Sequence, residues 1–166
     1  MSADTPGILP RIDSREAFVA AVRWGFERAA ADGARTITCV DANFELWPLD
    51  DPLLLQGLTG WLRQPMRRLV LLAARYDEVP RRQPRFTAWR RDWAHAIQAL
   101  QPPQELADNL PTLLLDDRKL SVHLIDSVHW RGRAALDGRA RLLWQEKVDA
   151  ILQRSEPGFV VTTLGL

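Results

Sequence analysis

The N-terminal half of the chain alternates between apolar residues at helical spacing and short, continuous apolar runs. In the segment 12–33, Phe18, Val22 and Phe26 recur every four residues and Gly33 follows, which predicts a helix with one buried face that ends at the glycine. The next segment, "RTITCVD", is rich in β-branched residues and too short for a helix. We therefore expect the fold to begin with a helix and a buried strand.

The next two elements repeat this alternation. Asp50 or Asp51 precedes Pro52, which favours a helix start because proline at the first helical position sacrifices no hydrogen bond. That helix is expected to end near Leu62. "LVLLAA", which begins at Leu69, is a continuous apolar run typical of a strand covered on both faces in a parallel sheet.

The second half of the chain is richer in strand patterns. Residues 84–100 keep helical spacing and are expected to form a third helix that stops before Pro102 and Pro103. "ELADNL" is then expected to hold a short edge strand. "TLLLD" and "LSVHLID" flank a polar turn from Asp116 to Lys119, which predicts a β-hairpin. The remaining expected elements are an extended segment at 127–136, an amphipathic helix at 139–155 and a last strand at 158–164.

This order of elements predicts the fold class. We expect a single α/β domain over residues 1–166, with its core in about 13–155, built as a layered mixed sheet with helices on both faces. The sheet should be parallel in the first half of the chain and partly antiparallel in the second.

Composition bears on the cellular compartment of the protein. The 166 residues include one cysteine, Cys39, which excludes an intrachain disulfide and Cys-based metal sites and favours a reducing compartment. The N-terminus lacks the pattern of a secretory leader, and no segment has the ~20 apolar residues that span a bilayer. The sequence thus favours a cytoplasmic protein without membrane insertion.

Charge is unevenly distributed. The net charge is +1, but residues 61–100 contain nine arginines against three acidic residues. Arginines interleave there with Trp89 and Trp93, a combination that can meet nucleic acid through phosphates and stacked bases. Because both tryptophans fall on the apolar stripe, we expect a core-packed helix with a solvated basic face instead, and nucleic-acid binding would require one of them to be exposed. The arginines of this segment are Arg81, Arg82, Arg85, Arg90 and Arg91.

Most signatures of catalysis are missing. The sequence has no phosphate-binding G-x-x-x-x-G-K-[ST] loop, no G-x-G-x-x-G, no G-x-S-x-G and no H-E-x-x-H. No cofactor and no metal is therefore predicted.

A candidate cleft comes from the expected topology. In open α/β sheets, ligands bind beyond the carboxyl ends of the parallel strands. Asp41, Asn43 and Trp47 follow the first expected strand, and Arg75 and Tyr76 follow the second. The alternative is that Asp41 and Arg75 form one ion pair between two loops while Trp47 packs as a lid on the core.

The histidines add a second candidate group. Strand alternation from Val128 to Arg133 would place His129, Arg131 and Arg133 in one polar row, which could hold a phosphate or could be the wet face of an edge strand. His123 is expected on the face of its strand opposite Val122 and Leu124. His95 is expected on the third helix as a solvated or capping side chain.

The order of elements and the hairpin resemble one half of the phospholipase D-like fold. The most similar parts are "LPTLLLDDRKLSVHLID" and "DGRARLLWQEKVDAILQRS", which match that superfamily's strand, Asp turn, strand and final helix, and the likeness spans roughly Asp13 to Ser155. The chain is also similar to a proteobacterial domain family of this degenerate type, which has no known activity. Single halves of the fold commonly pair, so the resemblance implies a homodimer as one option.

The resemblance also implies what is absent. The superfamily's catalytic element is H-x-K-x-x-x-x-D, in which His attacks phosphorus and Lys binds the phosphate. With the aspartate at Asp116 or at Asp117, "DNLPTLLL" supplies neither a histidine nor a lysine. The nearest imitation, His129-x-Arg131 with Asp137, has five intervening residues instead of four.

Three functions are consistent with the sequence. The first is a non-catalytic phospholipase D-like binding or interaction module of unknown ligand. The second is an enzyme with an anion or phosphoryl site at the carboxyl edge of the sheet. The third is a nucleic-acid-binding protein that uses the Arg-rich segment. The residues expected to line a binding cleft are Asp41, Asn43, Trp47, Arg75, Tyr76, His129 and Arg131.

Overall fold

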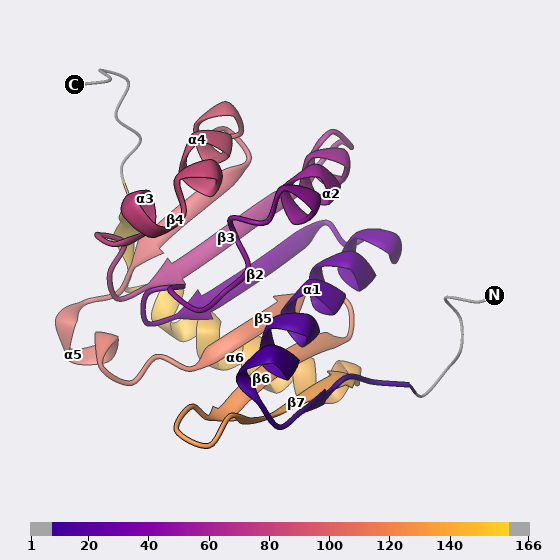
Figure 1. Cartoon of the computed structure of the whole chain (residues 1–166). Helices are drawn as coiled ribbons and strands as arrows, with labels where there is room; N and C mark the ends of the chain where they lie inside the picture. The colour runs from indigo at the N-terminus through magenta and orange to yellow at the C-terminus, as the bar shows by residue number, and fades with distance from the viewer. Residues whose placement is uncertain (1–7, 160–166) are drawn as a thin grey trace.

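A computed structural model describes residues 8–159. The chain forms one eight-stranded mixed sheet in the order β1-β7-β6-β5-β2-β3-β4-β8, with helices on both of its faces (Figure 1). This confirms the expected layered α/β class. The strands are β1 (Arg11–Ile12), β2 (Thr36–Asp41), β3 (Arg68–Ala73), β4 (Ile97–Gln101), β5 (Thr112–Asp116), β6 (Leu120–Asp126), β7 (Arg131–Leu136) and β8 (Glu156–Pro157). The helices are α1 (Arg15–Ala31), α2 (Pro52–Leu62), α3 (Val79–Arg82), α4 (Pro84–Asp92), α5 (Gln104–Ala107) and α6 (Gly138–Leu152).

Strand direction divides the sheet into two halves. β2, β3 and β4 are parallel, whereas β5 is antiparallel to β2, and β6 and β7 continue the antiparallel pattern. As a result, the carboxyl ends of β2 and β3 lie at the same edge as the turn between β6 and β7. We call this the carboxyl edge. The opposite edge, which we call the amino edge, contains the starts of β2, β3 and β4 and the turn between β5 and β6.

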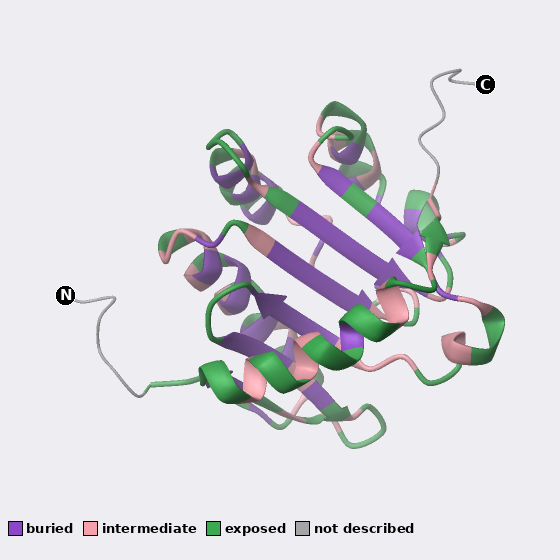
Figure 2. Ribbon diagram, turned by 180° about the vertical axis from the view of Figure 1, so that it is seen from behind, coloured by how far each residue is buried: buried purple, intermediate pink, exposed green. Residues whose placement is uncertain are grey.

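The two faces of the sheet are covered unequally. One face packs against α1, α2 and α4 and contains most of the buried aromatic side chains, including Phe18, Phe26 and Trp61. The other face is covered by α6, whose only fully buried residue is Val148 (Figure 2). Most of the hydrophobic stabilisation therefore comes from the first face.

Three expected elements are wrong or incomplete. The third helix ends at Asp92, and residues 97–101 form β4, where buried Ile97 and Ala99 alternate with exposed Gln98 on a parallel partner of β3. Pairing with a buried strand outweighed the helical spacing of this segment. "ELADNL" forms no strand, and α5 begins just before it. Of the expected strand 158–164, residues 160–164 lie outside the described residues, and the described strand is β8.

Among residues 8–159, no helix is long and apolar enough to cross a membrane.

Candidate functional site

Asp41 ends β2 at the carboxyl edge, and its carboxylate accepts hydrogen bonds from the neighbouring backbone. Oδ2 accepts hydrogen bonds from the N–H groups of Phe44 (2.8 Å) and Asn43 (3.3 Å), which closes the loop after the strand. Oδ1 accepts a hydrogen bond from the Thr112 hydroxyl at 2.6 Å, which ties this loop to β5. Asn43 in turn accepts from the N–H of Glu45 at 3.0 Å. The two polar residues that follow β2 thus hold the loop together.

Trp47 and Tyr76 belong to the core. Trp47 is 4% exposed and meets Phe44 edge to face at 5.1 Å between ring centroids, so the interpretation of Trp47 as a lid on the core is confirmed. Tyr76 is 7% exposed, and its hydroxyl lies 2.7 Å from the Leu100 carbonyl oxygen. Burial raises the pKa of this phenol well above its ordinary value. Neither side chain is placed to contact a ligand in solvent.

Arg75 does not pair with Asp41 in the described structure, so the expected ion pair is wrong. The two loops are joined instead by the backbone, because the Arg75 N–H donates to the Ala42 carbonyl at 3.0 Å. The Arg75 side chain is exposed and borders a shallow depression with Tyr76, Asp77 and Gln101.

Two aromatic residues at the carboxyl edge have a left-handed backbone. Phe44 has φ 57° and Trp130 has φ 55°, a conformation that is strained for bulky side chains. Phe44 is 1% exposed, and Trp130 packs on Phe18 with ring centroids 5.9 Å apart. The left-handed backbone at these two positions therefore directs the aromatic rings toward the core and away from any ligand in solvent.

The turn between β6 and β7 is closed by Asp126. Its Oδ1 accepts from the N–H groups of Val128 and His129, and its Oδ2 lies 2.9 Å from His129 Nδ1. These bonds, the His129 ring first, lower the pKa of Asp126. His129 lies in the turn and not on the strand, so the expected row of His129, Arg131 and Arg133 is reduced to two arginines on one face of β7. Val128, expected on the apolar face, is 79% exposed.

His123 is the histidine with the most altered environment. It is half-buried under α6, and its ring lies 4.4 Å from the Trp144 ring between centroids. Burial, and then the nearby Lys147, lowers its pKa. The expectation that it faces away from Val122 and Leu124 is confirmed, since these two belong to the core on the other face. His95 is exposed, as expected for a solvated side chain, but it lies in the turn after α4 and not on the expected third helix.

The Arg-rich segment is only partly a solvated face. Arg81 pairs with Glu78, and Arg82 pairs with Glu45 at 2.8 Å. Arg90, expected to be solvated, is 6% exposed, and its guanidinium lies 4.1 Å from the centre of the Phe159 ring. Burial lowers the pKa of Arg90. Trp89 and Trp93 are both half-buried against the core, so neither offers an open stacking face, and the condition stated above for nucleic-acid binding through this segment is not met.

Among the described residues of the carboxyl edge, Asp41 and His129 make their contacts apart from the side chains of Arg75 and Arg131. General acid–base chemistry requires a proton-transfer group beside the group that binds the anion. In the described part of the chain, no hydrogen bond or ion pair joins Asp41 or His129 to the side chain of Arg75 or Arg131. Residues 8–159 also contain no group of three His, Cys, Asp or Glu side chains that could hold a metal ion.

The two edges of the sheet have opposite charge. At the amino edge, the connections with their adjoining helical turns contain eleven arginines and lysines against five aspartates (28–35, 59–68, 89–96, 116–119 and 137–141). At the carboxyl edge, the corresponding segments contain seven cations against thirteen carboxylates (13–18, 41–55, 74–87, 102–111, 126–131 and 149–158). Sequence reasoning placed the anion site at the carboxyl edge and did not select Arg35, Arg63, Arg68 or Arg118. Their common signal is a position just before a strand or in a turn at the amino edge.

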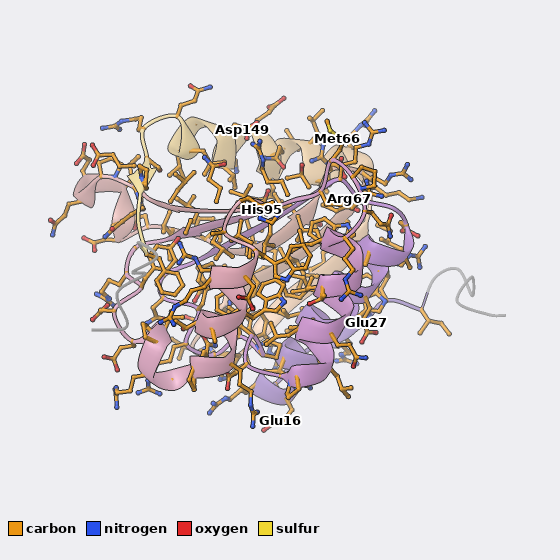
Figure 3. All side chains as sticks on the ribbon, turned by 90° about the horizontal axis from the view of Figure 1, so that it is seen from above. Glu16, Glu27, Met66, Arg67, His95 and Asp149 are labelled. Atoms are coloured by element: carbon orange, nitrogen blue, oxygen red, sulfur yellow. The ribbon has the colours of Figure 1, made fainter. Side chains whose placement is uncertain are left out.

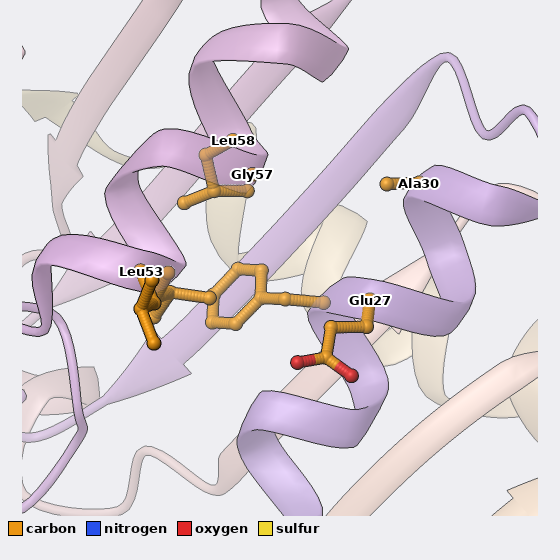
Figure 4. A pocket seen from close by; sticks show the side chains of 7 residues that line it. Glu27, Ala30, Leu53, Gly57 and Leu58 are labelled. Atoms are coloured by element: carbon orange, nitrogen blue, oxygen red, sulfur yellow. The ribbon is translucent and has the colours of Figure 1, made fainter.

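The concave places on the described surface differ widely in volume. The cavity between α1 and α2, bordered by side chains that include Glu27, Leu53 and Leu58, has a volume of about 60 Å³ (Figure 4). Small-molecule sites typically have about 300–1,000 Å³. A shallow depression of about 400 Å³ lies at the amino edge and is lined by Arg28, Asp32, Arg118 and Lys119.

Comparison with known proteins shows a likeness in fold to a solved structure. No protein-family model and no curated protein matches the chain. The fold is similar to that of TrmBL2, an archaeal chromatin protein that shows a novel mode of DNA binding, with a TM-score of 0.64 and 12% sequence identity. The likeness covers 93% of this chain and 56% of TrmBL2, so the chain spans little more than half of that protein. At this level of identity the comparison supports the fold alone.

Proposed function

We propose that this chain is a non-catalytic binding module on a phospholipase D-like scaffold, and that its ligand is nucleic acid. The non-catalytic part of the proposal rests on one observation: polar groups that the sequence suggested as site residues form hydrogen bonds within the fold. The oxygen atoms of Asp41 and Tyr76 form hydrogen bonds that close a loop or anchor a strand. His129 lies in a turn that the Asp126 carboxylate closes. A group fixed in this way supports the fold and is not free to transfer a proton.

The turn of the hairpin follows the same principle. Asp116, one of the two residues that the resemblance can align with the catalytic aspartate, is 2% exposed. Its Oδ1 accepts hydrogen bonds from the N–H groups of Arg118 (2.8 Å) and Leu120 (2.9 Å). These bonds close the turn, which supports a structural role for Asp116.

Nucleic acid becomes the favoured ligand on two observations. A protein that shares this fold binds DNA, and the amino edge of the sheet has more than twice as many cations as carboxylates. An anion site at the carboxyl edge, the enzyme alternative, is disfavoured by the thirteen carboxylates there, which would repel a phosphate.

Two assays test the proposal. The purified chain is expected to leave a chromogenic model phosphodiester uncleaved over hours, and to shift the fluorescence anisotropy of a labelled DNA duplex at low salt. Turnover that is abolished by Asp41→Asn or by His123→Ala would refute the non-catalytic part. An anisotropy that stays flat at high protein concentration and low salt would refute the choice of nucleic acid.

A further inference from the structure

We infer that the amino edge of the sheet is the surface that docks on the phosphate backbone of duplex DNA. The inference rests on the nucleic-acid binding proposed above and adds where the ligand lies and which of its features is read. It starts from the separation of charge between the two edges, because a surface that neutralises phosphates must present cations in excess over carboxylates.

The basic segments form one continuous platform. The Arg35 N–H donates to Asp117 Oδ1 at 3.1 Å, which joins the connection before β2 to the β5–β6 turn. The Arg68 N–H donates to the Arg35 carbonyl at 2.8 Å, and the Leu69 N–H donates to the Ala96 carbonyl at 3.0 Å. Four connections that are distant in sequence are therefore held side by side by two backbone hydrogen bonds and one to the Asp117 carboxylate.

Some of the cations on this platform are available to a ligand, whereas Arg28 is paired with Asp32 and Arg90 is buried. Arg63, Arg68 and Arg118 have exposed side chains and no ion pair among the described residues, whereas Arg82 and Arg154 at the carboxyl edge are each paired with a glutamate. A cation that is already paired with a carboxylate must lose that partner before it contacts a phosphate, so an unpaired one binds at lower cost.

Helix dipoles explain only part of this enrichment. Cations at the C-terminal turns of helices compensate the macrodipole, and Arg28 in α1 and Arg91 in α4 fit that role. The last turn of α2 has no basic residue, and Arg35, Arg68 and Arg118 lie outside the helices. The excess of positive charge thus extends beyond what the helix ends require.

The amino edge also has a shallow depression whose side chains could bind a phosphate. In the depression lined by Arg28, Asp32, Arg118 and Lys119, the single carboxylate is already engaged, since Asp32 Oδ2 lies 2.9 Å from Arg28 Nε. Arg118 and Lys119 remain unpaired in the described structure. Two such cations beside a concave surface fit a phosphate group.

Backbone contact, and not base stacking, is the mode that this edge supports. Single-strand binders stack bases on open aromatic faces. At this edge Trp61 is buried and Trp93 is half-buried. Met66 is an exposed apolar side chain beside Arg67 in the connection between α2 and β3 (Figure 3). A duplex, whose phosphates are arranged regularly and whose bases are already stacked, is therefore the expected partner.

A pair of charge-matched variants tests the inference. The amino-edge variant combines Arg63→Gln, Arg68→Gln and Arg118→Gln, and the control combines Arg75→Gln, Arg85→Gln and Arg131→Gln. All six side chains are exposed and none has a described ion pair, so both variants lose the same charge and no known contact. Thermal melts confirm that both fold. Affinity for a labelled duplex is measured by anisotropy between roughly 50 and 200 mM salt, the range over which phosphate contacts lose strength.

The amino-edge variant is expected to bind on the order of 10²-fold more weakly than the unmodified chain and to lower the slope of log K against log salt by about 2–3, while the control changes little. A lysine version of the amino-edge variant should recover most of the affinity. Equal losses in both variants, or a larger loss in the control, would overturn the inference and leave DNA binding standing. Absence of binding by the unmodified chain would remove the proposed function itself, and capture by phosphatidylserine vesicles without DNA binding would replace DNA with a membrane surface.

Discussion

Gly25 marks the closest approach of α1 to the β5–β6 hairpin, and its replacement by alanine should destabilise the fold. A Cβ atom at this position would lie 2.5 Å from Leu114 Cδ2 and 3.2 Å from Val122 Cγ2. Leu114 is 0% exposed, so its side chain has no open space to move into. Overpacking of this kind costs about 1–3 kcal/mol.

The higher helix propensity of alanine offsets part of the packing cost of Gly25→Ala. Alanine is more favourable than glycine in a helix interior by about 1 kcal/mol, so Gly25→Ala should lower the free energy of unfolding by a net amount of about 1 kcal/mol. Gly57 in α2 is the matched control, because a Cβ there meets nothing within 4 Å and Gly57→Ala should stabilise by about 0.5–1 kcal/mol. The difference between the two variants isolates the packing cost from helix propensity.

Urea unfolding followed by tryptophan fluorescence measures both free energies. Adding Leu114→Ala to Gly25→Ala makes room for the new methyl group, so the double variant should be more stable than the sum of the single losses implies. If Gly25→Ala stabilises the chain as much as Gly57→Ala does, α1 does not pack on the hairpin in this way and the reasoning is wrong.

The remaining predictions concern the polar residues. Asp41→Ala removes three hydrogen bonds and should lower the free energy of unfolding by about 2–3 kcal/mol, whereas Thr112→Val should lower it by about 1 kcal/mol. DNA affinity should not change, and its loss in a folded Asp41→Ala chain would place Asp41 in the binding site. The lowered pKa of His123 means that the unfolded chain binds a proton more readily than the folded one, so stability should fall as the pH drops below about 6.5, and His123→Phe should flatten that slope in urea midpoints measured from neutral to mildly acid pH. An unaltered slope in the variant would assign it to other groups. Arg90→Met exchanges a buried cation that has no described carboxylate partner for an apolar chain of similar length and should change stability by less than about 1 kcal/mol or raise it; a loss above about 3 kcal/mol would show that Arg90 has an essential partner.

Periodicity along the chain was sufficient to place most elements. Three local signals were enough for this. The apolar stripe of α1 marks its buried face, and the proline before α2 and the polar turn between β5 and β6 mark where elements begin and end. The same reasoning misplaced β4, since its residues fit both a helical stripe and a strand, and a parallel neighbour decided between them. The closing of the Asp41 loop on Thr112 was also beyond the sequence, because the partners are 71 residues apart.

The sequence by itself determined the α/β class, the hairpin and the lack of a histidine and lysine before its turn. The tertiary structure alone decided where charge gathers. β5 lies antiparallel to β2, which brings Arg118 and Lys119 beside Arg35 and Arg68 at the amino edge. The order of the strands depends on packing between segments that are far apart along the chain, and local patterns of apolar and polar residues do not encode it.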